Sequence, residues 1–167
     1  MFCCIDCNRE YKGTQFPLAA SSVQLVPEQS PPGQESPLVL DPTDPAIEPT
    51  KEIVFKRSRV QGRERWTPHG LTPRGRKTIT VCGLDRPGLL TLYADHVRDV
   101  VRPKLQPLFD AHRSRDVRGV HKAWNTAVRG LLHRARPFRA LSHDAMDVLI
   151  SAPIKERYEL RLERPTP

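Results

Sequence analysis

The 167-residue sequence predicts an α+β fold, in which a small sheet of about three strands packs on two to four helices. Three observations support this fold class. Two segments rich in β-branched residues come early, segments with helical periodicity follow, and a segment of alternating apolar and charged residues comes last. The predicted order is ββαα(α)β, and a disordered, acidic, proline-rich N-terminal arm precedes it.

The arm is expected over residues 1–50 and the basic α+β domain over residues 51–167. Residues 1–50 contain two Lys or Arg against seven Asp or Glu, whereas residues 51–167 contain 25 against 12. Eight of the 17 prolines lie in the arm, and the stretch Pro27–Pro37 contains only Pro, Gly, Ser, Gln and Glu. Such a stretch cannot bury enough surface to offset the entropy that ordering costs. We therefore expect residues 13–50 to be disordered, as a solvating tail or as a competitor for the domain's anionic ligand.

Two strands are predicted at the start of the domain. Residues 52–60 (EIVFKRSRV) are rich in β-branched and aromatic side chains, and residues 76–83 (RKTITVCG) alternate Ile79 and Val81 with more polar neighbours. The connection over residues 61–75 is polar and rich in Gly, Pro and Arg. It is long for a hairpin, but the two strands are expected to pair.

A helix is predicted to follow, with Asp85 as its N-cap and Pro87 in its first turn. Its apolar residues recur at three- and four-residue spacing as far as Val101. Pro103 and Pro107 are expected to kink this helix or to divide it, because proline lacks the N–H that a helix interior requires.

Two short elements end the predicted fold. A helix is expected from Ser142 or His143 to Ile150. Residues 155–163 (KERYELRLE) alternate Tyr and Leu with charged side chains, so we expect a half-solvated third strand there. His96 and His143 each stand beside an aspartate, and we interpret both as ordinary helix surface rather than as half of a metal or acid–base site.

The longest predicted helix, over residues 115–136, carries the clearest charge pattern. Ser114 is its expected cap and Pro137 its end. At about 100° per residue, one side of this helix collects cations and another collects apolar residues. The cations expected to contact phosphates are Arg115, Arg118, Lys122, Arg129 and Arg136. The residues expected to hold the helix against the sheet are Val117, Val120, Trp124, Val128 and Leu131.

Gly119 and Gly130 flank the cationic side of this helix. They would allow the close approach of a phosphate backbone, although a glycine lowers helix stability. Like charges on one line repel one another, so the pattern favours an anion-binding face. A plain solvated helix face is the alternative.

A second cationic cluster extends from Lys56 to Lys77 and contains eight Lys or Arg against one acid, Glu64. Arginine offers a planar fork to phosphate and stacks on bases, so this composition is typical of contacts to RNA or to single strands. A nuclear-import signal or a solvated loop would have the same composition. The expected contacts are Arg57, Arg59, Arg63 and Arg65, with Trp66 as a stacking platform for bases.

These patterns predict a non-enzymatic nucleic-acid-binding protein with an accessory or regulatory role. The net charge is +8 and the pI is near 9.7, and Arg outnumbers Lys by 20 to 7. RNA is expected rather than DNA, because Arg predominates and no DNA-recognition helix motif is present. No HExxH, GxSxG or GxGxxG motif occurs, so no catalytic residue is expected. An acidic, proline-rich arm on a small Arg-rich domain is a layout typical of compact viral accessory proteins and of chromatin or RNA adaptors.

Residues 70–78 (GLTPRGRKT) nearly match a phosphate-binding loop. The motif requires Gly, Lys and Thr in succession, but Arg76 separates Gly75 from Lys77. The strand expected from residue 76 also leaves no helix N-terminus to receive a phosphate. We therefore reject a nucleotide site in this segment.

Cys3, Cys4 and Cys7 lie near the N-terminus, and Cys82 stands alone. The Cys4–Cys7 spacing is that of half a zinc knuckle, and only His69 and Cys82 remain as further ligands, so no metal or other cofactor is expected. Acylation of Cys3 and Cys4 would instead make the protein an adaptor at an anionic membrane surface. Unmodified reduced thiols are the third interpretation.

The remaining alternative is a protein-interaction module, in which the prolines around Pro42–Pro45 dock to a partner protein. The sequence has no run of about 18 apolar residues, and no basic segment followed by an apolar one opens it. A cytoplasmic or nuclear location is therefore expected, without secretion and without a transmembrane segment.

Overall fold

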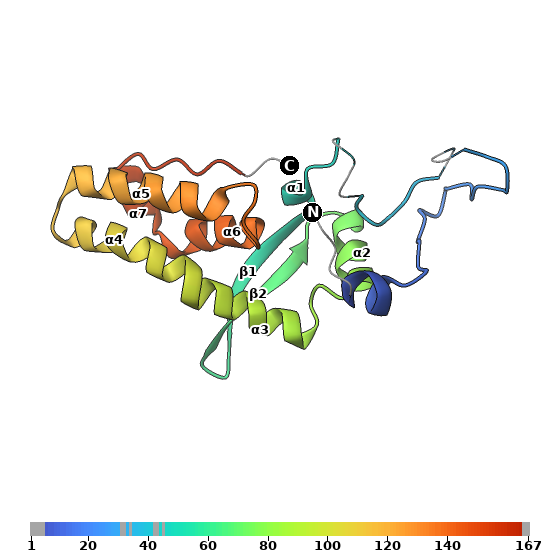
Figure 1. The fold of residues 1–167 in the computed structure, drawn as a ribbon, viewed down its shortest axis with the longest axis horizontal. Coiled ribbons are helices and arrows are strands. Elements are labelled where there is room, and N and C mark those ends of the chain that lie inside the picture. Colours follow the sequence, from blue (N-terminus) through green and yellow to red (C-terminus); the bar gives the residue numbers. More distant parts are fainter. Residues whose placement is uncertain (1–5, 31–32, 34, 42–43, 45, 165–167) are drawn as a thin grey trace. The chain divides into compact units, whose positions relative to one another are not determined.

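The computed structural model describes residues 6–30, 33, 35–41, 44 and 46–164. Within these residues the chain is mixed α+β, with seven α-helices, two π-helical segments and one two-stranded sheet (Figure 1). The predicted α+β class is confirmed, whereas three strands and a disordered arm are not. The chain divides into two compact units, unit 1 (Met1–Ile53 and Pro68–Arg86) and unit 2 (Val54–Thr67 and Pro87–Pro167).

Unit 1 contains η1 (Asp6–Lys12), α1 (Pro49–Glu52) and α2 (Pro73–Cys82). The strand predicted over residues 76–83 is therefore wrong, because this segment is helical. Thr72 caps α2 by accepting a hydrogen bond from the Gly75 N–H at 3.0 Å, and Pro73 begins the helix. Gly83 ends it in the left-handed conformation, with a φ of 56°. These two end signals outweigh the β-branched composition between them.

Part of the predicted arm packs within unit 1. Leu18 forms an isolated antiparallel bridge with Pro37. The backbone N–H of Leu40 donates to Thr78 Oγ1 at 2.9 Å, which ties the arm to α2. The disorder expected over residues 13–50 is therefore not confirmed, and a separate role for the arm stays a prediction.

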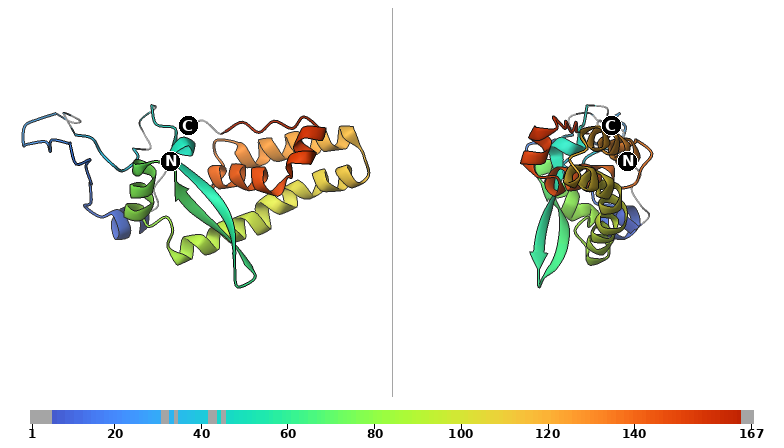
Figure 2. Two further views of the ribbon diagram at one scale, coloured as in Figure 1. Left: turned by 180° about the vertical axis from the view of Figure 1, so that it is seen from behind. Right: turned by 90° about the vertical axis from the view of Figure 1, so that its left-hand side faces the viewer.

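Strands β1 (Ile53–Val60) and β2 (Arg63–Gly70) form a hairpin (Figure 2). β1 confirms the first predicted strand, but β2 lies inside the connection expected over residues 61–75, so that part of the prediction is wrong. Gln61 and Gly62 make a two-residue turn, and both have positive φ, at 51° and 75°. This is the conformation of a type I′ turn, whose twist matches that of paired antiparallel strands.

In unit 2, α3 (Pro87–His96), η2 (Val97–Val101) and α4 (Arg102–Arg113) follow one another without a break. Helix α3 begins at Pro87 itself, so Asp85 is not its N-cap. Both prolines that were expected to divide the helix lie within α4. The helix widens by one π turn before Pro103, where the Arg102 N–H donates to the Val97 carbonyl, five residues back. This π turn accommodates a proline that has no N–H and crowds the preceding turn.

Unit 2 ends with α5 (Val117–Leu132), α6 (Arg139–Leu149) and α7 (Ala152–Arg157). Helix α5 is shorter than predicted at both ends. Asp116 is its cap instead of Ser114, because the Asp116 carboxylate accepts from the Gly119 N–H at 2.9 Å. Ser114 ends α4, where its hydroxyl donates to two carbonyls of that helix. Helix α6 begins at Arg139, earlier than predicted.

The third strand expected over residues 155–163 is wrong. Pro153 lies in the first turn of α7, which covers the first part of this range, and the sheet of the described residues contains only β1 and β2. The predicted alternation is nevertheless present in the burial pattern, since Tyr158 and Leu160 are buried and Glu159 is exposed. The alternation therefore indicates one face turned toward the core of unit 2, without strand pairing.

The core of unit 2 joins the helices to the hairpin. Its fully buried side chains include Trp66, Val97, Leu105, Leu108, Val120, Leu131, Leu141 and Met146. Helix α5 packs mainly on α4 and α6, so the prediction that its apolar face holds it against the sheet is wrong. The apolar face itself is confirmed, because Val120, Trp124 and Leu131 are buried and Val128 is half-buried, although Val117 is exposed.

Candidate nucleic-acid interface

The positive charge of the chain is concentrated in unit 2. This unit contains 20 Lys or Arg against 10 Asp or Glu, a net charge of +10 with His neutral. Unit 1 contains the other seven Lys or Arg against nine Asp or Glu, a net charge of −2. The net charge of unit 2 has the sign that attracts a polyanion, and a candidate interface consists of cations that the unit's own carboxylates do not neutralise.

Three cations form a row along the outer side of α5, namely Arg118, Lys122 and Arg129, and we call them the α5 row. At about 100° per residue, they lie within about 40° of one another and span about 16 Å along the helix axis. Their side lies opposite the buried residues Val120 and Trp124, so all three are exposed. None of the three forms an ion pair with any described residue.

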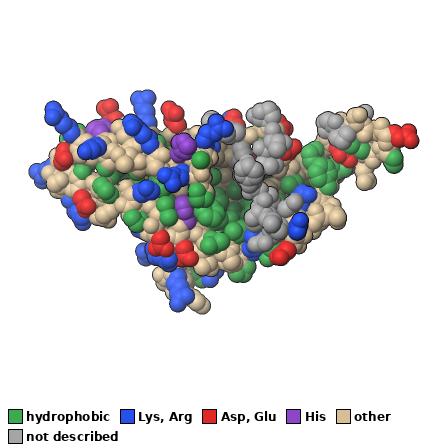
Figure 3. All heavy atoms as spheres, in the orientation of Figure 1, with side chains coloured by type: hydrophobic (Ala, Val, Ile, Leu, Met, Phe, Trp, Pro, Cys, Tyr) green, Lys and Arg blue, Asp and Glu red, His purple; other side chains and the backbone are tan. Residues whose placement is uncertain are grey.

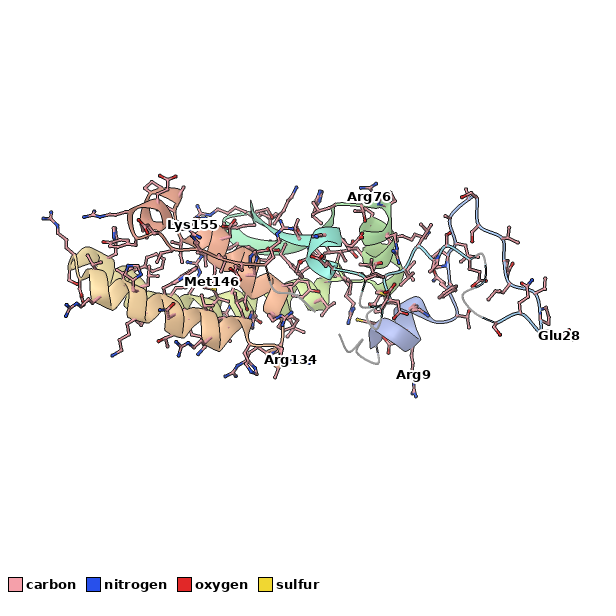
Figure 4. All side chains as sticks on the ribbon, turned by 90° about the horizontal axis from the view of Figure 1, so that it is seen from above. Arg9, Glu28, Arg76, Arg134, Met146 and Lys155 are labelled. Atoms are coloured by element: carbon pink, nitrogen blue, oxygen red, sulfur yellow. The ribbon has the colours of Figure 1, made fainter. Side chains whose placement is uncertain are left out.

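Arg115 and Arg136, predicted to lie on the same line, are outside the helix. Arg115 has a φ of 59° and lies in the turn between α4 and α5. Arg136 lies in the turn after α5, where its N–H donates to the His133 carbonyl at 2.9 Å. Figure 4 shows Arg134 in this same turn, directed away from the helices. The predicted continuous row of five is therefore wrong, because α5 begins after Asp116 and ends before His133.

Of the two glycines of α5, Gly119 is required by contacts inside unit 2, whereas at Gly130 the close approach of a partner's backbone stays a prediction. A Cβ on Gly119 would overlap the Asp116 carboxylate and would lie 3.1 Å from the Ala111 Cβ of α4. A Cβ on Gly130 would lie 3.5 Å from the Lys104 ammonium of α4. Both glycines thus lie where α5 faces α4, and Gly119 also leaves room for the helix cap.

Four further cations lie on the hairpin, namely Lys56, Arg59, Arg63 and Arg65, and we call them the hairpin cations. All four are exposed, and none is paired with a carboxylate in the part of the chain that the structure describes. The two-residue turn places Val60 opposite Arg63, so Lys56, Arg63 and Arg65 share one face of the hairpin, which carries no carboxylate. Figure 3 shows Lys and Arg side chains at the projecting end of the hairpin.

Arg57 differs from its neighbours, because Glu64 neutralises it. Glu64 Oε2 accepts from Arg57 Nη2 at 2.8 Å and from Arg102 Nη2 of α4 at 2.7 Å, and Glu64 Oε1 accepts from Trp66 Nε1 at 2.8 Å. Burial alone raises the pKa of the Glu64 carboxyl, but the Trp66 hydrogen bond and the charges of Arg102 and Arg57 outweigh it, so the pKa lies below its ordinary value. Arg57 therefore joins β1 to β2 through Glu64, while Arg102 joins Glu64 to α4, and Arg57 is not counted with the hairpin cations.

The stacking platform predicted at Trp66 is wrong. Trp66 is 0% exposed and lies in the core of unit 2. On β2 its side chain shares the inward face with Glu64, which accepts the indole N–H. Within residues 53–70 and 117–132, no Phe, Tyr or Trp ring is exposed, and the exposed rings are the imidazoles of His69 and His121. The two cationic surfaces can therefore offer charge and hydrogen bonds, and their arginine guanidinium groups, not a Phe, Tyr or Trp ring, can stack on bases.

The rest of the second predicted cluster, Arg74, Arg76 and Lys77, lies on α2 in unit 1. A helix follows the nearly matching phosphate loop, so the strand expected there is not the reason to reject a nucleotide site. The reason is that Gly75 lies inside the first turn of α2, and the Glu52 carbonyl occupies the space beside its Cα. A phosphate has no room there, and Arg76 still interrupts the motif.

The predicted acylation and zinc residues Cys3 and Cys4 lie outside the described residues. Cys7 is buried, and Arg86 Nη1 donates to its sulfur at 3.2 Å, while Cys82 is buried on α2. The described ranges contain no group of three His, Cys, Asp or Glu side chains arranged to hold a metal ion. No helix among the residues that the structure describes is long and apolar enough to cross a bilayer.

His143 and Asp144 form internal contacts instead of the helix surface that the sequence suggested, whereas Asp95 beside His96 pairs with Arg98 on the helix surface. His143 is buried, its Nδ1 lies 2.9 Å from Asp144 Oδ1, and Asp144 Oδ2 accepts the Phe55 N–H of β1 at 2.6 Å. His96 Nε2 lies 2.8 Å from Ser142 Oγ, and burial lowers the pKa of His96 below its ordinary value. Ser142 is 0% exposed and His96 is half-buried, so this pair joins α3 to α6.

Comparisons of this chain with protein-family models, with curated proteins and with solved structures find no match. The function must therefore be argued from the charge, exposure and geometry of the two cationic surfaces.

Proposed function

We propose that this protein is a non-enzymatic nucleic-acid-binding protein, with an accessory or regulatory role, that holds phosphate backbones with the α5 row and the hairpin cations. One observation carries the proposal. Seven exposed Lys and Arg on α5 and on the two strands of the hairpin form no ion pair with the described carboxylates. Other cations of this unit, such as Arg98, Arg113 and Lys155, pair with nearby aspartates.

Phosphate is the group that these side chains fit best. Five of the seven are Arg, whose planar fork can donate two parallel hydrogen bonds to one phosphate. Arg118 and Lys122 lie one helical turn apart, and like charges at this spacing repel each other, a cost that a bound anion would remove. RNA is the partner we favour, because Arg outnumbers Lys by 20 to 7. Since no Phe, Tyr or Trp ring is exposed on the hairpin or on α5, a duplex of high charge density should bind better than a single strand.

A salt titration of binding tests the proposal. Fluorescence anisotropy would follow a labelled RNA duplex of about 20 base pairs, the same duplex as DNA, and the single strands, from about 50 to about 200 mM salt. A short duplex that contacts one surface of three or four cations should give a slope of log K against log [salt] of about −3 to −4. A single strand should give a slope of about −2 to −3.

Two variants with equal net charge show whether binding depends on where the cations lie or only on how many cations the protein carries. The test variant replaces Arg63, Arg65, Arg118 and Arg129 by Gln, and it should bind about tenfold more weakly with about half the salt slope. The control variant replaces the ion-paired cations Lys51, Arg98, Arg113 and Lys155 by Gln, and it should bind nearly as the wild type does. Equal losses in the two variants, or no binding by the wild type, would contradict the proposal.

The hypotheses of an acylated membrane adaptor and of a protein-interaction module stay predictions. Cys3 and Cys4, and residues 42, 43 and 45 of the expected docking peptide, lie outside the described residues.

A further inference from the structure

The α5 row and the hairpin cations lie on opposite sides of unit 2. The buried face of α5 contacts α4 and α6, so the α5 row points away from these helices. The hairpin is held elsewhere on the same core, since Glu64 binds Arg102 at the start of α4 and the Phe55 ring lies 5.1 Å from the Tyr93 ring of α3. In Figure 1 and in both views of Figure 2, α5 lies above the path of α3 and α4, and the hairpin tip lies below it.

The tip of the hairpin projects from the helical core. Every residue from Lys56 to Arg63 is exposed, and the five residues that end β1 extend about 15 Å. Glu64, the second residue of β2, holds the hairpin on α4 close to the turn, so the tip beyond it can present Arg59 and Arg63 on a preformed ribbon. A two-stranded ribbon fits a B-form major groove about 12 Å wide, whereas on an A-form duplex the same cations would be limited to the phosphates.

We infer that one molecule binds two separate duplexes at the same time, one on the α5 row and one on the hairpin cations, and so links them. This inference rests on the proposed function. A DNA duplex of about 20 base pairs is far shorter than its persistence length of about 150 base pairs, so it cannot bend around unit 2 from one surface to the other. Each surface therefore receives its own segment. On a longer nucleic acid, the same two contacts would hold distant segments together, and the second contact would be strengthened by the first.

Energy transfer between two labelled duplexes tests the link. Two RNA duplexes of unrelated sequence, one with a donor and one with an acceptor, are mixed with the full-length protein at about 50 mM salt, and two DNA duplexes are tested in parallel. The wild type should raise energy transfer above the level of the duplexes alone. With duplex in excess, sedimentation should show two duplexes on each protein chain.

Two single-surface variants identify the origin of the signal. The row variant replaces Arg118, Lys122 and Arg129 by Gln, and the hairpin variant replaces Arg59, Arg63 and Arg65 by Gln. Each should retain binding of one duplex per chain and lose energy transfer to the level of the duplexes alone. The ion-paired control variant of Lys51, Arg98, Arg113 and Lys155 should retain both properties.

The outcomes distinguish this inference from the proposed function. Energy transfer that persists in either single-surface variant would show that copies of the chain link duplexes through one surface, and it would overturn the inference. One duplex per wild-type chain in the presence of excess duplex would overturn it as well, and both results leave the proposed function in place. Absence of binding to every duplex would overturn the proposed function itself.

Discussion

Glu64 receives three donors near the tip of the hairpin, from Trp66, Arg57 and Arg102. Because the folded state lowers the pKa of this carboxyl, the unfolded chain takes up a proton at a higher pH than the folded chain does. The stability that Glu64 contributes is therefore complete above about pH 5 and is lost as the pH falls through the lowered pKa. One carboxylate thus makes the attachment of the hairpin sensitive to acid.

Replacing Glu64 by Gln should lower the free energy of unfolding at neutral pH by about 1–2 kcal/mol, because two guanidinium groups lose a charged acceptor. The same change should reduce the loss of stability between about pH 5 and about pH 3. Urea unfolding followed by circular dichroism at several pH values measures both effects. Glu156→Gln removes an exposed carboxylate of α7 and is the matched control. Identical pH profiles for Glu64→Gln and the wild type would contradict this role.

The burial of both tryptophans leads to a second prediction for single residues. Trp66 and Trp124 are 0% and 6% exposed, so their fluorescence should resist quenching by acrylamide. Addition of an RNA duplex should leave this fluorescence unchanged, since neither ring can stack on a base. In Trp124→Phe, which leaves Trp66 as the single indole, quenching by RNA that high salt reverses would contradict the burial of Trp66 in the bound state.

Among the elements, α2 could have been predicted from residues that the strand interpretation did not weigh. Thr72 and Gly83 are a helix cap and a helix stop, and they bound this segment on both sides. The burial of Val81 is compatible with either structure, but Thr78 and Cys82, four residues apart, are buried on the same helix face. The composition of residues 76–83 favoured a strand because β-branched residues are frequent in strands, but the capping residues make this segment helical.

The candidate site was predictable only where it depends on local periodicity. The α5 row follows from a repeat of about 3.6 residues, and it persists although both ends of the helix were placed wrongly. The burial of Trp66 was not predictable, because the turn at Gln61 and Gly62 lacks the usual Asn-Gly signal and the polar composition of residues 61–75 is typical of a loop. The bond between Glu64 and Arg102 joins residues 38 positions apart, and no local pattern indicates it.

The two glycines of α5 should respond in opposite ways to alanine. Gly119→Ala should cost about 1–2 kcal/mol, because the added methyl group displaces the Asp116 carboxylate from the helix cap. Gly130→Ala meets only the flexible Lys104 ammonium at 3.5 Å, so it should gain about 0.5–1 kcal/mol from helix propensity. Thermal unfolding followed by circular dichroism measures both changes. Stabilisation by both alanines would contradict the close contact of α5 with α4 at Gly119.

For the molecule as a whole, the same charges act on folding and on binding in opposite directions. Unit 2 has a net charge of +10, and grouped cations repel one another in a compact state. A bound polyanion relieves this repulsion, and so does salt, which also releases the polyanion. Salt should therefore stabilise the fold while it weakens the proposed complex.

Arg118 tests this opposition directly. It lies one turn from Lys122 and in the first turn of α5, where the helix dipole disfavours a cation. Arg118→Gln should raise the free energy of unfolding by about 0.5 kcal/mol at about 0.1 M salt. The gain should disappear near 1 M, where the Debye length falls to about 3 Å. The same variant should bind an RNA duplex more weakly than the wild type at the lower salt concentration.

Thermal melts at both salt concentrations measure the change in stability, and fluorescence anisotropy at the lower salt concentration measures the change in RNA binding. If Arg118 serves binding only, the wild type should be less stable than the Arg118→Gln variant when no ligand is present. A variant less stable than the wild type at about 0.1 M salt would instead show that Arg118 has a structural partner in solution.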